Sequence, residues 1–188
     1  MSKLHYIIVL IVVLAIATLT YQLSTSVDKT ADLTDPSLRH DPDYFISEFK
    51  ATMYDQSGIA NYRLAATHLE HFPDNDTIEV QDPRVEYIDK TRQVWLATSD
   101  YGIGYENTEI LTLSGNVKIV SNNPDPDKNL VLETDKLTIT FAKKQASTDT
   151  RVKITGKNST ITSKGMDVNL DTGILTLKSQ ARGQYVPK

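Results

Sequence analysis

The chain has 188 residues, a formal net charge of −4 and no cysteine. Without cysteine, neither disulfide bonds nor thiolate metal sites are available, so the fold must rely on its core and its strand pairing. Residues 1–127 carry 9 Lys and Arg against 19 Asp and Glu, whereas residues 128–188 carry 11 against 5. The basic part is compatible with an acidic partner, with phosphate or with a solvated strand face, and its few aromatic residues argue against nucleic acid.

The first predicted element is a transmembrane helix over residues 6–23. No charged side chain lies between Lys3 and Asp28. A run of about 20 apolar residues, at about 1.5 Å per residue, spans the hydrocarbon core of a bilayer. The lysine on the short side and the acidic flank after the helix predict that residues 1–5 are cytoplasmic.

A removed signal peptide is the alternative for this run. Ala15-Ile16-Ala17 fits a small-x-small cleavage site behind an apolar core. Apolar and aromatic residues continue past that site to Leu23, which favours a retained anchor. The rest of the chain is therefore predicted to lie on the far side of a membrane.

A polar, acidic tether is predicted over residues 24–43, followed by one β domain over residues 44–188. The tether contains two prolines and no apolar period. Apolar residues then alternate with polar ones with period 2, most clearly from Leu111 to Ile119. Arg63 to Phe72 is ambiguous between a helical turn and a strand.

Turn signals separate the alternating segments at short intervals. They are Gln56–Gly58, Pro73–Asp76, Asn122–Asp127, Thr155–Asn158 and Asp171–Gly173. Such spacing is typical of an antiparallel sandwich, barrel or open roll, so the fold class is predicted to be all-β.

Candidate catalytic and metal sites are weak. His68 and His71 are three residues apart, which places them on opposite faces of a strand and differs from the helical zinc motif. Gly102-Ile103-Gly104 lacks the third glycine of a dinucleotide site, and no nucleophile motif occurs. The sequence therefore predicts neither an enzyme nor a cofactor nor a metal site.

The ordered motifs of the chain resemble those of a known family. They are Tyr54 to Ala66, Asp82-Pro83-Arg84-Val85, Trp95-Leu96-Ala97, Leu111 to Val117 and Val152 to Gly156. Together with the single anchor and the chain length, these motifs are similar to the LptC family of lipopolysaccharide export proteins in Gram-negative bacteria. The resemblance covers essentially the whole chain.

The resemblance implies an open, twisted antiparallel β-jellyroll in the periplasm on a single-pass inner-membrane anchor. Its interior groove would accept lipopolysaccharide from the ABC exporter of LptB, LptF and LptG at the N-terminal edge. The C-terminal edge would then pass the lipid to LptA. The predicted composition suits this task, because apolar side chains can shelter acyl chains at roughly 25 cal/mol per Å² removed from water.

The resemblance also implies site residues. The lipid-binding positions are Val80, Tyr87, Leu111, Leu113, Val117, Leu137, Ile139, Phe141, Val152, Ile154, Leu175 and Tyr185. The interface with LptA is expected at Ile174, Thr176, Leu177 and Lys178, by addition of a strand to the sheet edge. Gly156 is expected to adopt a positive φ, and the pattern around Trp95 leaves its face open.

A carbohydrate-binding or structural periplasmic β domain is the alternative function. It predicts exposed aromatic side chains around a sugar in place of an apolar interior. Five tyrosines lie before residue 102 in the β region, which is compatible with this alternative. The distribution of aromatic side chains in the fold distinguishes the two.

Overall fold

The computed structural model describes residues 40–89, 92–105 and 109–186. The predicted transmembrane helix at residues 6–23 and most of the predicted tether lie outside these residues. Within the described ranges, no helix has both the length and the apolar character needed to cross a membrane. Residues 42–188 form one unit that contains every described strand.

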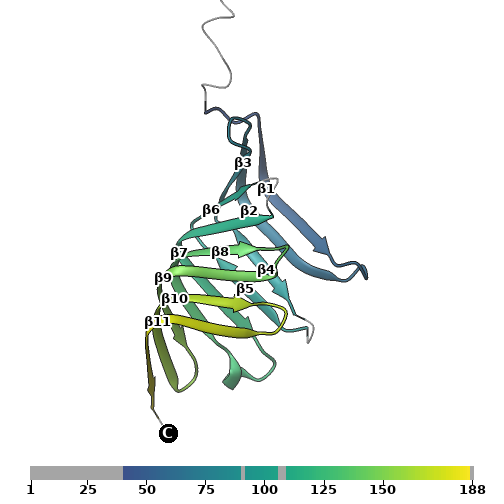
Figure 1. Cartoon of the computed structure of the whole chain (residues 1–188). Helices are drawn as coiled ribbons and strands as arrows, with labels where there is room; N and C mark the ends of the chain where they lie inside the picture. The colour runs from purple at the N-terminus through teal and green to yellow at the C-terminus, as the bar shows by residue number, and fades with distance from the viewer. Residues whose placement is uncertain (1–39, 90–91, 106–108, 187–188) are drawn as a thin grey trace, which may run out of the picture. The chain divides into compact units, whose positions relative to one another are not determined.

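The described residues of the unit form eleven strands and one short 3-10 helix (Figure 1). They are β1 (Tyr44–Tyr54), β2 (Ala60–Phe72), β3 (Thr77–Gln81), β4 (Arg84–Ile88), β5 (Val94–Thr98), β6 (Tyr101–Tyr105), β7 (Ile110–Asn122), η2 (Pro126–Lys128), β8 (Val131–Thr140), β9 (Gln145–Thr155), β10 (Ser159–Asn169) and β11 (Ile174–Tyr185). All pairings among them are antiparallel, which confirms the predicted all-β class. The ambiguous stretch from Arg63 to Phe72 is strand throughout.

The long strands contribute to two layers, as in a jellyroll. The first half of β7 pairs with β6, whereas its second half pairs with β5. Likewise, the first half of β2 pairs with β4 and its second half with β3. We name the two layers after the short strands that they contain: the β3–β6 layer and the β4–β5 layer. Strands β8 to β11 extend both layers by successive hairpins.

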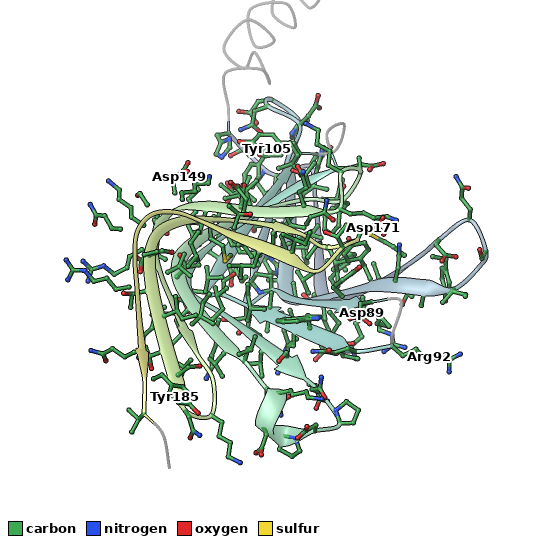
Figure 2. The ribbon with its side chains drawn as sticks, turned by 60° about the horizontal axis from the view of Figure 1, so that its bottom comes forward. Asp89, Arg92, Tyr105, Asp149, Asp171 and Tyr185 are labelled. Carbon is green, nitrogen blue, oxygen red and sulfur yellow. The ribbon has the colours of Figure 1, made fainter. Side chains whose placement is uncertain are left out.

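A line of bulges marks the bend between the layers. The register shifts between Ser114 and Val117 in β7 and between Lys164 and Met166 in β10. Gly115 and Gly165 lie at these shifts with φ of +75° and +80°, a conformation that suits glycine. Figure 2 shows β10 and β11 turning sharply midway, so that Asp171 and Tyr185 lie at the ends of different layers.

The core lies between the two layers. Leu113, Val117, Leu137, Val152 and Met166 are at most 1% exposed and belong to one hydrophobic cluster. Their polar neighbours along each strand point outward, so the predicted period-2 alternation is confirmed for the central strands. The outermost strands β1 and β11 are mostly exposed, and each pairs with one neighbour among the described strands.

All five predicted turns coincide with strand connections, although Asn122 and Thr155 are the last residues of β7 and β9. The expected conformation of Gly156, however, is wrong. Positive φ occurs at Gly58, Gly115, Gly165 and Gly173 and does not occur at Gly156. A Cβ atom at Gly156 would lie 3.0 Å from Ser159 Oγ and 3.3 Å from a methyl carbon of Leu130. Close packing in the β9–β10 turn, and not backbone handedness, therefore favours glycine at this position.

Candidate functional site

The interior between the layers contains two apolar cavities. The larger has a volume of about 410 Å³ and the smaller about 240 Å³. Val85 is the one residue that lines both. Because the long strands bring side chains from both layers to this space, the cavities are a direct product of the bend.

Side chains from both layers line the larger cavity. The β4–β5 layer contributes Tyr62, Val85, Tyr87, Trp95, Ala97, Ile119, Leu130 and Leu132, and the β3–β6 layer contributes Leu137, Ile139, Ala146, Met166, Val168, Leu170 and Leu175. Polar lining groups come from the loops: Asp89 and Gln93 lie between β4 and β5, and Asp171, Thr172 and Gly173 between β10 and β11. The cavity is therefore apolar inside and polar where the hairpins end.

The smaller cavity lies towards β1, β3 and β6. Phe49, Leu64, Ile78, Val80 and Leu111 contribute its apolar walls. Gly102 on β6 packs directly on this wall, because a Cβ atom there would lie 2.8 Å from Val80 Cγ2. Gly102 of the Gly-x-Gly motif thus leaves the space that the Val80 side chain occupies, whereas a Cβ atom at Gly104 would make only ordinary contacts.

Along the boundary between the cavities, the ring of Tyr62 contacts two other aromatic rings. The ring of Tyr62 lies 5.1 Å from that of Tyr87 and 5.0 Å from that of Phe141, centroid to centroid. Tyr62 and Tyr87 line the larger cavity, and Phe141 lines the smaller. Such aromatic pairs contribute about 0.5–1.5 kcal/mol beyond their buried area. These rings form an aromatic partition that separates the two spaces.

A hydrogen bond joins the two layers beside this partition. The Tyr87 hydroxyl on β4 donates to the Leu170 carbonyl after β10, with an O···O distance of 2.8 Å. Burial, with smaller effects of Asp89 and Asp171, raises the pKa of Tyr87. Figure 2 labels Asp89 and Asp171 on the side of the domain away from the bend. The bond therefore fastens the open ends of the layers to each other.

The Tyr62 hydroxyl differs from that of Tyr87. It is buried and has no hydrogen-bond partner among the described residues. Burial, followed by the effects of Tyr87 and Asp171, raises the pKa of Tyr62 to about 12. A buried hydroxyl without a partner costs about 1–3 kcal/mol. The cavity wall thus presents a donor that a ligand oxygen would satisfy.

The two tyrosines give a matched test of these assignments. Tyr87→Phe should lower the free energy of unfolding by about 0.5–1.5 kcal/mol, because the Leu170 carbonyl loses its donor. Tyr62→Phe should leave stability unchanged or raise it, because it removes an unsatisfied group. Urea denaturation of both variants measures the difference, and equal losses would contradict these hydrogen-bond assignments.

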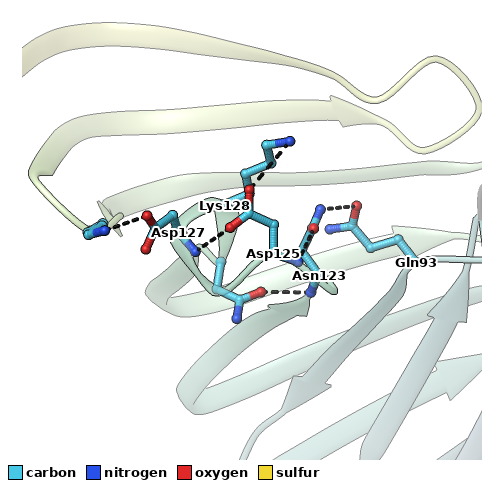
Figure 3. Close-up of polar contacts among 7 residues, drawn as sticks. Gln93, Asn123, Asp125, Asp127 and Lys128 are labelled. Atoms are coloured by element: carbon cyan, nitrogen blue, oxygen red, sulfur yellow. Dashed lines mark hydrogen bonds and ion pairs between the residues drawn. The ribbon is translucent and has the colours of Figure 1, made fainter.

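Polar side-chain contacts order the β7–β8 loop beside the larger cavity (Figure 3). The side-chain Nδ2 of Asn123 donates to Gln93 Oε1 at 3.2 Å, and the backbone N–H of Asn123 donates to Asn129 Oδ1 at 2.7 Å. Lys157, in the β9–β10 turn, forms an ion pair with Asp127 of the β7–β8 loop. Gln93, in this network, lines the cavity, and so does Leu130, whose backbone N–H donates to Ser121 Oγ at 2.8 Å. Side-chain contacts therefore fix the β7–β8 loop to Gln93, a cavity-lining residue, and to the β9–β10 turn.

The structure brings most of the predicted lipid-binding residues to the interior. Tyr87, Leu137, Ile139 and Leu175 line the larger cavity, and Val80, Leu111 and Phe141 line the smaller. Leu113, Val117, Val152 and Ile154 are buried in the core and line neither cavity. Tyr185 is 70% exposed near the end of β11, apart from the others.

The predicted interface residues all lie on β11. Ile174, Thr176 and Lys178 are exposed, whereas Leu177 is partly buried and packs against the core. Lys178 is already engaged, because its Nζ lies 2.8 Å from Asp149 Oδ1 and 3.2 Å from Asp167 Oδ1. The predicted interface side chains therefore differ in how accessible they are to a partner. The backbone of this edge strand pairs with one described neighbour, β10.

Several residues that line the larger cavity are not among the predicted groove residues. Trp95 and Ala97 face the larger cavity, which settles the orientation that the sequence left open. Met166 and Tyr62 also line it, although neither was among the predicted groove residues. The alternation of Trp95 and Ala97 along β5 is compatible with an inward face. Val94 and Leu96 form an equally apolar alternation on the opposite face, so the sequence alone does not show which pair faces the cavity.

His68 and His71 take part in separate contacts. His71 Nδ1 lies 2.6 Å from Asp43 Oδ1, and its ring stacks on Tyr44. His68 Nε2 lies 3.2 Å from Glu70 Oε1, and its ring stacks on Phe45. No group of three metal-ligating side chains occurs in the part of the chain that the structure describes.

The fold and the cavities define a two-layered β-jellyroll with an apolar interior. A solved structure with this fold is LptH of Pseudomonas aeruginosa, described as the LptA homologous periplasmic component of the lipopolysaccharide transport device. It aligns with a TM-score of 0.52 and 13% identity over 67% of this chain and 95% of that one. At this identity the similarity concerns the fold alone.

Sequence comparison gives the family. The profile described as lipopolysaccharide-assembly, LptC-related, matches residues 8–186. The lipopolysaccharide export system protein LptC of Haemophilus influenzae is 26% identical over 94% of this chain and 92% of that protein. The chain therefore belongs to the LptC family, and it is a non-enzymatic component of lipopolysaccharide transport. Members of the family are periplasmic proteins anchored in the inner membrane.

Proposed function

We propose that the protein holds the acyl chains of lipopolysaccharide between its two layers during transport to the outer membrane. It receives the lipid from the inner-membrane exporter of LptB, LptF and LptG and passes it to LptA. The observation that carries the proposal is the pair of apolar cavities lined from both layers. Acyl chains placed there leave water at a gain of roughly 25 cal/mol per Å².

The chemistry of the larger cavity suits an acylated glycolipid better than a plain hydrocarbon. The buried Tyr62 hydroxyl has no partner among the described residues, and an ester or amide carbonyl near the head of an acyl chain accepts such a hydrogen bond. The polar groups Asp89, Gln93 and Asp171 lie at the hairpin ends, where a sugar would meet water. An anionic glycolipid gains no overall attraction from a chain of net charge −4, so acyl chains are the main handle.

The two sheet edges suit the two exchanges. Strand β1 is one edge and β11 the other, and each has one described neighbour. An incoming strand pairs with exposed backbone N–H and C=O groups at such an edge and continues the sheet. We place the exporter at β1 and LptA at β11, so that the interior runs through the protein from one partner to the other.

The distribution of aromatic residues gives no support to the carbohydrate-binding alternative. Tyr62 contacts both Tyr87 and Phe141 between the layers. The exposed aromatic residues are spread over three strands: Tyr44, Phe45 and Tyr54 on β1, Tyr105 on β6 and Tyr185 on β11. Tyr44 and Phe45 are neighbours on one strand, so their side chains point to opposite faces, where they stack on His71 and His68 respectively. No ring contact joins these exposed residues to one another among the described residues, so they give no direct evidence of the aromatic platform that the alternative predicts.

Fluorescence of Trp95 tests acyl-chain binding directly. It is the one tryptophan of the chain and lines the larger cavity. Lipopolysaccharide or a simpler glycolipid with brominated acyl chains should quench its emission strongly, because bromine would lie in contact with the indole ring.

The matched control moves the tryptophan to the other face of β5. In a Trp95→Phe/Leu96→Trp variant the indole occupies the position next along the strand, which points away from the cavity. Quenching should be largely lost in this variant while binding persists. Equal quenching at both positions, or none at Trp95 with bound lipid, would contradict the proposal.

A further inference from the structure

We propose that a basic cleft on the outer face of β9, β10 and β11 binds a phosphate group. The cleft has a volume of about 500 Å³ and is lined by Arg151, Thr162, Ser163, Lys164, Gln180 and Arg182. Three of these six residues are cationic and none is acidic. The site is separate from both apolar cavities, with which it shares no lining residue.

The register shows why the cations converge. Arg151 on β9 lies directly opposite Lys164 on β10, and Thr162 on β10 lies opposite Arg182 on β11. Arg151 and Lys164 are exposed, whereas the adjacent pair Val152 and Ser163 is buried, so both charges point away from the core. Figure 2 shows nitrogen-tipped side chains outside the bend, between Asp149 and Tyr185.

Like charges placed directly opposite each other destabilise a strand pair unless a counter-charge offsets them. The neighbouring carboxylates do not supply it. Asp149 and Asp167 both bind Lys178, and Glu133 pairs with Lys153. The hydrogen bond from Lys178 lowers the pKa of Asp149, and those to Asp149 and Asp167 raise the pKa of Lys178.

The three cleft cations therefore remain without a protein counter-ion in the described structure. None of Arg151, Lys164 and Arg182 forms an ion pair with a carboxylate among the described residues. The stem of Lys178 lies across Gly165, where a Cβ atom would be 2.7 Å from Lys178 Cδ. Gly165 thus lets Lys178 cross β10 to the two aspartates, which leaves the cleft positive.

The composition of the cleft favours phosphate over a simple halide or a single carboxylate. Two guanidinium groups and an ammonium group supply directed donors from three adjacent strands, and arginine pairs with phosphate oxygens in a bidentate manner. The Thr162 and Gln180 side chains add neutral donors at the same cleft. Either free phosphate or the phosphorylated head group of a glycolipid presents this chemistry.

The test uses the full-length protein in detergent and measures binding of pyrophosphate by isothermal titration calorimetry. Arg151→Gln/Arg182→Gln should weaken binding at least about tenfold, since two charge-assisted contacts are lost. The control, Arg92→Gln/Lys143→Gln, removes two charges from exposed positions outside the cleft and should change affinity by less than about twofold. The same variants are then titrated with a phosphorylated glycolipid and with its dephosphorylated form.

The outcomes separate the sources of phosphate. A variant-sensitive loss with both pyrophosphate and the phosphorylated glycolipid supports a site for phosphate itself. A loss with the phosphorylated glycolipid alone supports a head-group site. Equal losses in cleft and control variants, no effect on either probe, or cleft-dependent binding of polyglutamate in place of both probes would overturn the proposal. Trp95 quenching by brominated acyl chains should survive in the cleft variants, so this test is independent of the proposed lipid binding.

Discussion

Replacing Val168 with Asp should weaken lipopolysaccharide binding at least about tenfold. Val168 is partly buried on β10, packs against the core and lines the larger cavity. Its register partners Ala146 and Leu175 line the same cavity. A carboxylate that faces an acyl chain must remain solvated or become neutral, and either requirement costs more than about 1.4 kcal/mol, a factor of ten.

Two further variants separate charge from shape and from unfolding. Asparagine is similar in size to aspartate but uncharged, so Val168→Asn should lose less affinity than Val168→Asp. Thr176→Asp adds the same charge at an exposed position of β11 that lines no cavity, and its affinity should remain near wild type. Circular dichroism establishes that each variant is folded. A folded Val168→Asp protein that binds lipid as well as wild type would place the binding site elsewhere.

Proline substitutions along β11 should weaken LptA capture with a period of two residues. Successive residues of an edge strand direct their backbone N–H groups alternately towards the neighbouring strand and away from it. Proline removes the N–H group, so it interrupts strand addition only where that group points away from β10. Substitutions from Ile174 to Lys178 sample both orientations.

Alanine at the same positions is the control, because it keeps the N–H group. Proline at alternate positions should reduce the capture of LptA by the purified domain. Alanine at the same positions should reduce capture less than proline does. Proline at the remaining positions should instead weaken the β10–β11 pairing, which thermal unfolding would reveal. Equal effects of proline and alanine, or unchanged LptA capture after deletion of Lys178 to Lys188, would mean that LptA docks on another surface.

Much of the fold follows from local patterns. The alternation from Leu111 to Ile119 and the five turn signals depend on neighbouring residues, and the structure confirms them. The bend was not predicted, because it arises from bulges that align only after the strands have paired. Gly165 illustrates the point: its positive φ and its contact with Lys178 involve β11 and not its own sequence neighbours.

The candidate site was harder to predict than the fold. Period 2 identifies the inward face, but it does not distinguish a residue in the closed core from one beside a cavity. Leu113 and Ile139 share that face of the sheet, yet only Ile139 lines the larger cavity. The aromatic partition joins Tyr62, Tyr87 and Phe141 from distant parts of the chain, so no local pattern could reveal it.

The most direct test of acyl-chain transport through the interior is photo-crosslinking in living cells. A photoreactive residue in place of Val80 or Leu175 would lie in the wall of the smaller or the larger cavity, respectively. Gln81 and Thr176, the next residues along the same strands, are exposed and line neither cavity. Transport through the interior predicts lipopolysaccharide adducts at Val80 and Leu175 and few or none at Gln81 and Thr176. Adducts of equal yield at all four positions, or at Gln81 and Thr176 alone, would contradict it.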